Sequence, residues 1–488
     1  MPPAAQDANA RSPVVLTIGV ILLGYILATL AGWTAPGSSQ AVHHDDGPAV
    51  HVAHFWAVIP FALLLGAIAV LPLLHRASHW WEHNLNKFFV AGGLALITLL
   101  YLAVLHPDAS FARAARSLEH VMLADYIPFI ILLFSLYTIS GGIRIEGDLP
   151  AHPLTNTTMI LSGGLLASFI GTTGAAMLLI RVLLETNSER KHVAHTVVFF
   201  IFVACNCGGL LLPLGDPPLF LGYLHGVEFL WTLSLWKSWL FVNGMLLAAY
   251  LAIDHFFYYP HETKADIAAD ETRIRKLKFS GVWPNGLLLV GVILSVALLD
   301  SSKPLPGTTW HPYLYLREAA QLALVGASLL FGTRAVREAN NFDYLPIVEV
   351  AVLFVGIFMA MQPALEILNA RGADLGIDTP QKFFWAAGWL SSVLDNAPTY
   401  LVFFEAARNI SGGASETMAG VATPLLTAVS LGAVTMGAMT YIGNGPNFMV
   451  KTIAEKSGVP MPSFFGYMAY SFTILLPILA VASWLFLD

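Results

Sequence analysis

Apolar runs of about 20 residues recur along the chain and limit it to a helical membrane fold. They lie near residues 14–32, 52–74, 87–105, 121–141, 236–258, 284–300, 345–368 and 462–487. About 20 helical residues cover about 30 Å, the thickness of the hydrocarbon core of a bilayer. Backbone polar groups find no water there, so each run is predicted to form a helix. Residues 313–333, which are polar at one end, are predicted to form a further helix whose polar end faces protein or the membrane interface.

The composition agrees with a membrane protein and excludes several function classes. Hydrophobic residues make up 56% of the 488 residues and charged residues 11%, against about 25% charged in soluble domains. The net charge of −7 lies in short loops, so no basic face for nucleic acid is expected. Cys205 and Cys207, in an apolar segment, favour core packing over a redox or zinc site. We find no H-E-x-x-H motif or nucleophile with its base, so we predict neither an enzyme nor a cofactor.

The chain divides into an N-terminal part and two halves. Residues 1–51 contain the apolar run Val14–Leu30 and a loop that is predicted to be extracytoplasmic. This run exceeds the roughly 7–15 apolar residues of a signal peptide, which favours a retained helix over a cleaved one. Residues 52–259 and 284–488 are the predicted halves, and 260–283 is a polar linker between them. Its basic residues place the linker in the cytoplasm.

Two apolar segments contain a polar break at their centre. Segment 155–184 breaks at Gly171-Thr172-Thr173-Gly174, and segment 383–408 breaks at Asp395-Asn396-Ala397-Pro398. A charge and a proline inside a membrane helix are costly unless the helix is interrupted there. Arms of about 12 residues, roughly 18 Å each, would reach the bilayer midplane and return. We therefore predict two re-entrant helical hairpins, and a pair of kinked ordinary spans is the alternative.

Two further helices are predicted to unwind and then resume. They lie in segments 193–230 and 421–457, with breaks at Pro213–Pro218 and Tyr441–Pro446. Proline and glycine at a break remove backbone donors and favour irregular conformations. Each segment is predicted to be an unwound helix followed by a short second half.

The breaks of the first half have counterparts in the second half. Residues 166–174 align with 390–398, where Leu and Ser coincide and the polar breaks are in register. Residues 214–220 align with 442–448, where Gly, an acid or its amide, Pro and Phe correspond. The separation is nearly the same in both cases. With hairpins not counted as crossings, about 11 transmembrane helices are predicted, and the two halves form an inverted-topology repeat.

The two hairpins, the G-T-T-G and D-N-A-P-T breaks and the P-L-G-D-P-P turn resemble the ion transporter superfamily. Bacterial sodium/proton antiporters and citrate carriers of that superfamily are similar to residues 52–487. The resemblance implies a scaffold with a mobile transport part, a homodimer, and elevator-like alternating access. Dicarboxylate carriers of the superfamily have a Ser-Asn-Thr signature in each hairpin. This chain departs from that signature at Gly171-Thr172-Thr173 and at Asp395-Asn396, which puts carboxylate transport in doubt.

Polar side chains at the breaks are the candidate site residues. Sodium prefers several hard oxygen ligands, which short polar side chains and unwound backbone provide. The candidates for substrate or ion binding are Ser168, Thr172, Thr173, Asn206, Ser392, Asn396, Thr399, Asn444 and Asn447. Those for Na⁺ are Thr172, Asp395, Asn396 and Asn444. Turn and capping chemistry is the alternative role for such residues.

Asp395 and Asp216 are the predicted proton and cation coupling residues. A carboxylate in a low dielectric can hold either a proton or a bound cation, and that competition is a simple coupling mechanism. For Asp216, capping of the helix that follows is the alternative role.

These features predict a secondary active transporter in a bacterial-type inner membrane. The first hypothesis is exchange of Na⁺ or Li⁺ for H⁺, because two acids and few basic groups lie at the breaks. The alternative is a cation-coupled carrier of citrate, another carboxylate or another anion, held by positive half-helix ends. The expected partners are the lipid bilayer, small ions or a small carboxylate, and a second copy of the chain.

Overall fold

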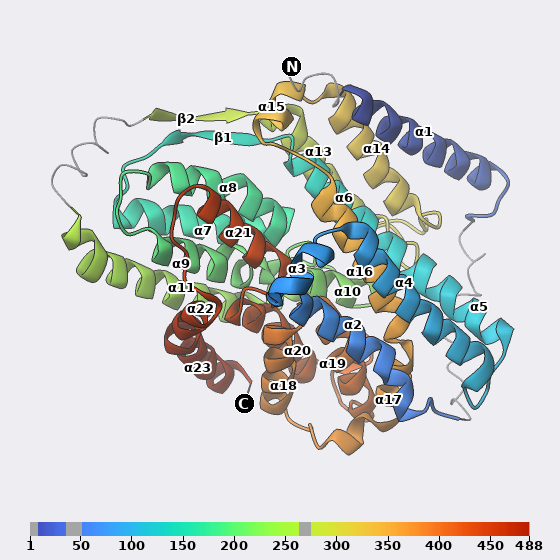
Figure 1. Cartoon of the computed structure of the whole chain (residues 1–488). Coiled ribbons are helices and arrows are strands. Elements are labelled where there is room, and N and C mark those ends of the chain that lie inside the picture. Colours follow the sequence, from blue (N-terminus) through green and yellow to red (C-terminus); the bar gives the residue numbers. More distant parts are fainter. Residues whose placement is uncertain (1–7, 36–50, 263–274, 488) are drawn as a thin grey trace. The chain divides into compact units, whose positions relative to one another are not determined.

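The computed structural model describes residues 8–35, 51–262 and 275–487 (Figure 1). Helices dominate it, so the predicted helical class is confirmed. The strands are short: β1 (Arg144–Asp148) with β2 (Arg275–Ser280), and β3 (Thr417–Met418) with β4 (Val421–Ala422), form two-stranded sheets. Thr417 lies opposite Ala422 in the antiparallel second sheet. The predicted extracytoplasmic loop, from residue 36 to 50, and residues 263–274 of the predicted linker lie outside the described residues.

Within the described residues, 6 helices are long and apolar enough to cross a membrane, or up to 7 if one bent pair is a single span. The protein is therefore a multi-pass membrane protein. The bent pair is Leu345–Ala360 with Gln362–Leu375, at an angle of 43°. It covers the apolar run predicted at 345–368, and the bend falls where Pro363, in the first turn of the second helix, cannot continue the first. The 6 helices are Pro13–Leu30, Asn84–Leu105, Phe111–Ser140, Ala194–Leu211, Trp231–His261 and Phe464–Phe486.

The chain divides into two compact units. Unit 1 contains residues 1–49, 127–144 and 279–347. Its helices are α1 (Ala8–Leu30), α6 (Ile127–Ser140), α13 (Val282–Leu298), α14 (Leu316–Phe331) and α15 (Arg334–Ala339). Helix α14 packs against α1, α6 and α13. It is the central helix of this unit.

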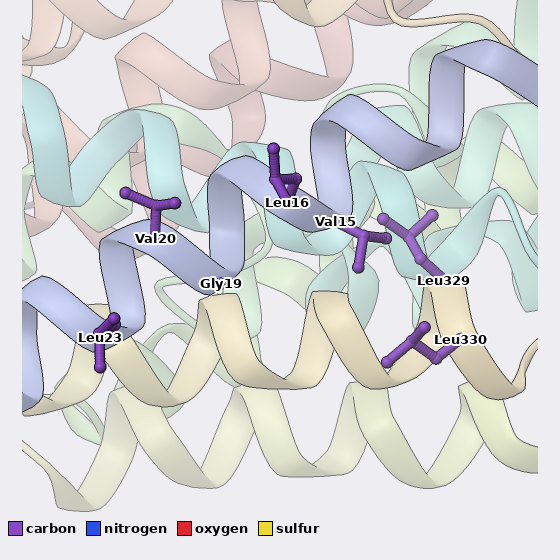
Figure 2. Close-up of a pocket in the computed structure, with 7 residues that line it drawn as sticks. All are labelled: Val15, Leu16, Gly19, Val20, Leu23, Leu329 and Leu330. Atoms are coloured by element: carbon purple, nitrogen blue, oxygen red, sulfur yellow. The ribbon is translucent and has the colours of Figure 1, made fainter.

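An apolar groove of about 670 Å³ runs between α1 and α14 (Figure 2). On α1 the groove is lined by Val15, Leu16, Gly19, Val20 and Leu23, and on α14 by Leu329 and Leu330. Its lining has only aliphatic side chains and one glycine, as expected for a surface in contact with lipid tails.

Unit 2 contains residues 50–126, 145–278 and 348–488. It holds all four predicted breaks. Its peripheral helices are α2 (Ile59–Val70), α3 (His75–Trp81), α4 (Asn84–Leu100), α5 (Phe111–His120), α11 (Trp236–Ile253), most of α16 (Leu345–Ala360), α17 (Gln362–Arg371), α22 (Phe464–Tyr470) and α23 (Leu476–Phe486). π-helical turns extend several of them: Tyr101–Leu105 after α4, Val121–Tyr126 after α5, Asp254–Tyr258 after α11 and Ser471–Leu475 after α22.

Two helical hairpins form at the breaks that the sequence indicates. The first consists of α7 (Pro153–Ile170) and α8 (Thr172–Thr186), which pack against each other. Gly171 between them has φ 79°, a conformation that only glycine adopts readily. The second consists of α18 (Pro380–Val393) and α19 (Asn396–Ile410), which also pack against each other.

Two broken helices complete the centre of unit 2. Helix α9 (Ala194–Ala204) gives way to a 3₁₀ turn, Cys207–Leu211, and then to α10 (Pro217–Leu224). Helix α20 (Thr423–Met436) gives way to a 3₁₀ turn, Gly437–Met439, and then to α21 (Gly445–Lys456). Both short helices carry proline in their first turn, where its missing N–H costs nothing.

Each short helix packs against the hairpin that is distant from it in the sequence. Helix α10 of the first half packs against α19 of the second hairpin, and α21 of the second half packs against α8 of the first hairpin. The glycines allow the unwound segments to approach closely: a side chain at Gly443 would meet the Ser391 carbonyl oxygen at 2.8 Å. This arrangement brings the four breaks together in the interior of unit 2.

Candidate functional site

The Asp216 carboxylate is the centre of the polar cluster at the four breaks. Its Oδ1 accepts hydrogen bonds from the Thr172 hydroxyl at 3.0 Å and from the Asn444 amide nitrogen at 3.1 Å. Its Oδ2 accepts one from the Asn396 amide nitrogen at 2.5 Å. Asp216 is 1% exposed, and all three partners are neutral. A buried carboxylate with neutral partners is costly unless a proton or a cation compensates its charge.

Four helices begin at this cluster. Asp216 and its three donors each stand at the N-terminal end of a different helix. Asp216 and Asn444 are the N-cap residues of α10 and α21. Thr172 and Asn396 are the first residues of α8 and α19. Free backbone N–H groups and the helix dipole make such ends positive. Several helix N-termini together can therefore attract an anion without any Arg or Lys side chain.

Asn396 offers an oxygen ligand at the same place. Its Nδ2 points to Asp216, so its Oδ1 is turned away, and this atom is buried without a hydrogen-bond partner among the described residues. An unpaired buried amide oxygen costs free energy that a bound ion or substrate group could recover. Together with the Thr172 hydroxyl and the Asp216 carboxylate it forms an oxygen-rich set of the kind that Na⁺ prefers.

Asn206 and Asn447 extend the cluster between the halves. Asn206 Nδ2 donates to Asn447 Oδ1 at 2.8 Å, and Asn444 Nδ2 donates to Asn206 Oδ1 at 3.2 Å. All three side chains are buried. The sequence-predicted residues that the structure brings into one network are thus Thr172, Asn206, Asp216, Asn396, Asn444 and Asn447.

Asp395 has a different environment. Its carboxylate accepts a hydrogen bond from the Ala397 backbone N–H at 3.1 Å and caps α19. The residue is half-buried and lies within electrostatic reach of Asp216. Two ionised carboxylates within electrostatic reach of each other repel, and a cation beside them would relieve that repulsion.

The other predicted site residues bond to nearby backbone or lie beside the network. Ser392 and Thr399 donate to carbonyl groups of their own helix segments, Trp389 at 2.7 Å and Asp395 at 3.0 Å. Ser168 donates to the Gly208 carbonyl at 2.6 Å and so ties the first hairpin to the 3₁₀ turn. Thr173 lies half-buried in the first turn of α8.

Sequence reasoning missed two contributors. The Cys205 carbonyl accepts a hydrogen bond from Asn444 Nδ2 at 3.0 Å. The Thr440 hydroxyl donates to the Ser392 carbonyl at 2.6 Å and accepts from the Gly443 N–H at 3.1 Å. A polar residue directly before the predicted break was the available signal for Thr440. A backbone carbonyl such as that of Cys205 has no signal in the sequence.

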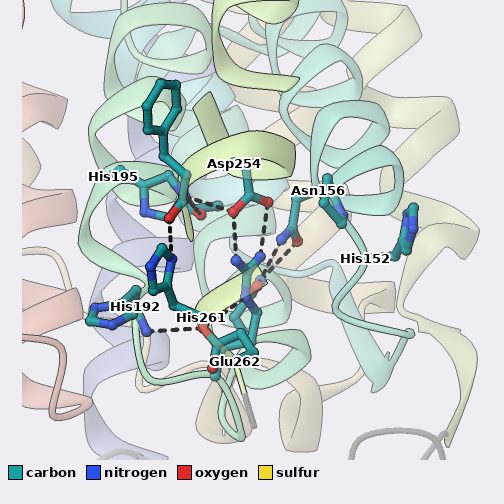
Figure 3. Close-up of polar contacts among 12 residues, drawn as sticks. His152, Asn156, His192, His195, Asp254, His261 and Glu262 are labelled. Atoms are coloured by element: carbon teal, nitrogen blue, oxygen red, sulfur yellow. Dashed lines mark hydrogen bonds and ion pairs between the residues drawn. The ribbon is translucent and has the colours of Figure 1, made fainter. Parts of the chain in front are cut away.

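A second buried polar cluster holds the connection from α8 to α9 (Figure 3). Arg190 donates to both oxygens of Asp254, at 2.9 and 2.5 Å, and its Nε lies 3.5 Å from Glu262. Asp254 also contacts His195 Nε2 at 3.0 Å and accepts from the Tyr250 hydroxyl at 3.1 Å. The cluster fixes the outgoing end of the first hairpin to the π-helical turn after α11. Sequence reasoning did not find it, because its members are far apart along the chain.

The described residues contain no group of three or more His, Cys, Asp or Glu side chains suited to a metal ion. Both cysteines are buried and unpaired, consistent with the core packing predicted for them. The polar cluster around Asp216 offers hydroxyl, amide and carboxylate oxygens, which suit a hard cation better than a soft transition metal.

Comparison with protein families assigns the chain to a family. A search of curated proteins finds no relative. The model of the family described as "Putative citrate transport" matches residues 50–487, which is nearly the whole chain. That family is part of the ion transporter superfamily and consists of transporters, which confirms the expected resemblance and the expectation that the chain is no enzyme. The chain is thus a member of this citrate transport family.

Proposed function

We propose that this protein is a secondary active carrier of citrate or a related carboxylate, driven by a coupled Na⁺ or H⁺. One observation carries the proposal: the N-terminal ends of four helices meet at one buried cluster around Asp216. Helix N-termini supply the positive potential that an anionic substrate needs. Membership in the citrate transport family points to the same class of substrate.

Asp216 gives this carrier a coupling mechanism. An ionised Asp216 would repel a carboxylate substrate from the four helix ends. A proton or Na⁺ on Asp216 removes that repulsion and leaves the helix dipoles for the substrate. Cation and carboxylate therefore bind together more readily than either alone, which is the requirement for symport.

Thr172, Asn396 and Asn444 would serve as oxygen ligands for the cation or as hydrogen-bond partners of the substrate. The unpaired Asn396 Oδ1 is the best candidate for a cation contact. Asp395 would act as a second, more accessible acid near the same ion.

We propose that the two hairpins are re-entrant and that the halves have opposite topology, with 11 spans and the two hairpins in all. The lengths of the four arms support this: α8, α18 and α19 have 15, 14 and 15 residues, and α7 has 18. At 1.5 Å per residue they cover roughly 21–27 Å, less than the hydrocarbon core of about 30 Å. The domain limits 52–259 and 284–488, a homodimer and an inner-membrane location belong to the same proposal.

Exchange of Na⁺ for H⁺ is the second candidate function. The neutral partners of Asp216 favour it, because a buried acid without a basic partner can carry either ion alternately.

Uptake of labelled citrate into proteoliposomes separates the two functions. An inward Na⁺ or H⁺ gradient should drive concentrative citrate uptake by the purified protein. A proton flux evoked by Na⁺ in the absence of any carboxylate, with no citrate uptake, would overturn the carrier proposal in favour of exchange. Protein-free liposomes and the Asn243→Ala variant are suitable controls, since Asn243 bonds only to the Cys207 and Trp239 carbonyls among its described partners.

A further inference from the structure

A chain of three asparagine side chains ends at Asp216, and its direction is determined by backbone carbonyl groups. Asn447 Nδ2 donates to the carbonyl oxygens of Gly437 and Thr440, both at 2.9 Å. An amide nitrogen has two hydrogens, and both are used here. Asn447 must therefore present its Oδ1 to Asn206.

Asn206 is oriented in the same way. Its Nδ2 donates to Asn447 Oδ1 at 2.8 Å and to the Ile201 carbonyl at 2.9 Å, which again uses both hydrogens. Its Oδ1 is therefore the atom that faces Asn444, at 3.2 Å from Asn444 Nδ2. A reversed Asn206 amide would place its oxygen against two acceptors, and each such contact costs free energy.

The side-chain amide of Asn444 is oriented by three acceptors, one of which is Asn206 Oδ1. Its Nδ2 lies within hydrogen-bond distance of three acceptors: the Cys205 carbonyl at 3.0 Å, Asn206 Oδ1 at 3.2 Å and Asp216 Oδ1 at 3.1 Å. A reversed Asn444 amide would oppose its oxygen to all three. The Asn444 Oδ1 is thus held on the side away from Asp216, where it can meet an ion or a substrate group.

We propose that Asn206 is a positioning residue, which sets the orientation of the Asn444 amide and does not itself contact the transported species. This inference rests on the proposed function, because it assigns a role to Asn206 within the same site. Asn206 is 0% exposed, and its three polar contacts use both of its donors and its oxygen. It has therefore little capacity left for a substrate or ion.

The consequence is a coupling between the two asparagines. Replacement of Asn206 by Ala removes one of the three acceptors that orient Asn444 and leaves Asn447 Oδ1 unpaired. When Asp216 holds a proton or Na⁺ it is a weaker acceptor, and the Cys205 carbonyl is then the one strong acceptor left for the Asn444 amide. Asn444 should therefore sample the reversed orientation more often, and the apparent KM for citrate should rise about tenfold. Vmax should change far less, since Asn206 itself does not contact the transported species.

A double-mutant cycle in proteoliposomes tests the proposal. The variants are Asn206→Ala, Asn444→Ala and both together, with the KM and Vmax of citrate uptake as readout. If Asn206 acts through Asn444, the double variant has the KM of Asn444→Ala alone. Multiplied effects on KM, or a loss confined to Vmax, would overturn the proposal.

Asn243→Ala is the matched control for loss of a buried amide. Asn243 is 1% exposed and donates to two carbonyls without contacting Asn444. The fold-change in KM that Asn243→Ala causes, whatever its size, should multiply with the fold-change that Asn444→Ala causes. Should Asn206→Ala fail to give monodisperse protein, Asn206→Ser keeps a hydroxyl in a smaller void and enters the same cycle.

The failure of the carrier proposal would be visible separately. If wild-type protein does not take up citrate, the carrier function is wrong, and the cycle is then read on the Na⁺ concentration that gives half-maximal proton flux. Independent effects of Asn206 and Asn444 in that assay would still overturn the positioning role.

Discussion

Replacement of Arg190 by Met should destabilise the protein by about 3–5 kcal/mol, the usual cost of breaking a buried ion pair by removing one partner. Asp254 accepts four hydrogen bonds, two of them from Arg190. The variant leaves this carboxylate at 0% exposure with only His195 and Tyr250 as partners. Glu262 is less affected, because the Lys191 backbone N–H still donates to it at 3.0 Å.

A second substitution checks that charge, and not lost packing, causes the effect. Arg190→Met keeps most of the side-chain volume, and Asp254→Asn removes the opposing charge. The double variant should therefore be more stable than Arg190→Met alone. An exposed pair supplies the control: Arg334 lies 2.5 Å from Glu338 with 39% and 51% of the side chains exposed. Arg334→Met should cost at most about 1 kcal/mol.

The measurement is the free energy of unfolding of purified protein in mixed micelles, titrated with a denaturing detergent and followed by circular dichroism. Equal costs for Arg190→Met and Arg334→Met would refute the reasoning. So would a double variant that is less stable than Arg190→Met, because the cluster would then not be held together by complementary charge.

Three further predictions concern a glycine contact, a loop histidine and the second acid. Gly215→Ala should destabilise the fold by at least about 1–3 kcal/mol, because its Cβ would lie 2.8 Å from the carbonyl carbon of Gly209. Gly445→Ala has open space around the new Cβ and should be tolerated in the same titration. Burial lowers the pKa of His106, in the loop after Leu105, so the unfolded chain binds a proton at this histidine more readily than the folded protein does. The midpoint temperature of unfolding should therefore fall as the pH drops through about 6.5. The same pH dependence of the midpoint in His106→Gln would contradict this. Asp395→Asn should keep the N-cap, because Asn caps a helix about as well as Asp, and it should keep cation-driven uptake, because we assign the coupling to Asp216. Loss of the cation dependence would make Asp395 the coupling acid.

The helical hairpins could be predicted from sequence because membrane burial makes a polar break conspicuous. The breaks predicted within 155–184 and 383–408 are the ends of α7 and α18 and the starts of α8 and α19. The bend near 361 was not predicted, because Pro363 lies in the first turn of a helix, where proline is ordinarily tolerated. The π-helical turns were not predicted either, since they leave no distinct pattern of residue types.

The site could be predicted as a set of residue types but not as a geometry. Repeat matching pointed to Thr172, Asp216, Asn396 and Asn444, and these four are in direct contact. Sequence analysis favoured Asp395, because an acid inside an apolar segment is harder to explain structurally than an acid in a turn. It could not reveal that Asp216 receives donors from both hairpins, because this depends on the packing of α10 against α19 and of α21 against α8. The role of each acid in coupling stays a prediction.

Citrate uptake by the Asp216→Asn variant is the most direct test of the account. Asn396 can turn its unpaired Oδ1 toward the new amide, so the variant should fold and remain monodisperse. With no carboxylate at position 216 to titrate or to bind Na⁺, it should no longer accumulate citrate against its gradient when an inward Na⁺ or H⁺ gradient is imposed on proteoliposomes. Concentrative uptake that still follows the cation gradient in this variant would contradict the central role of Asp216.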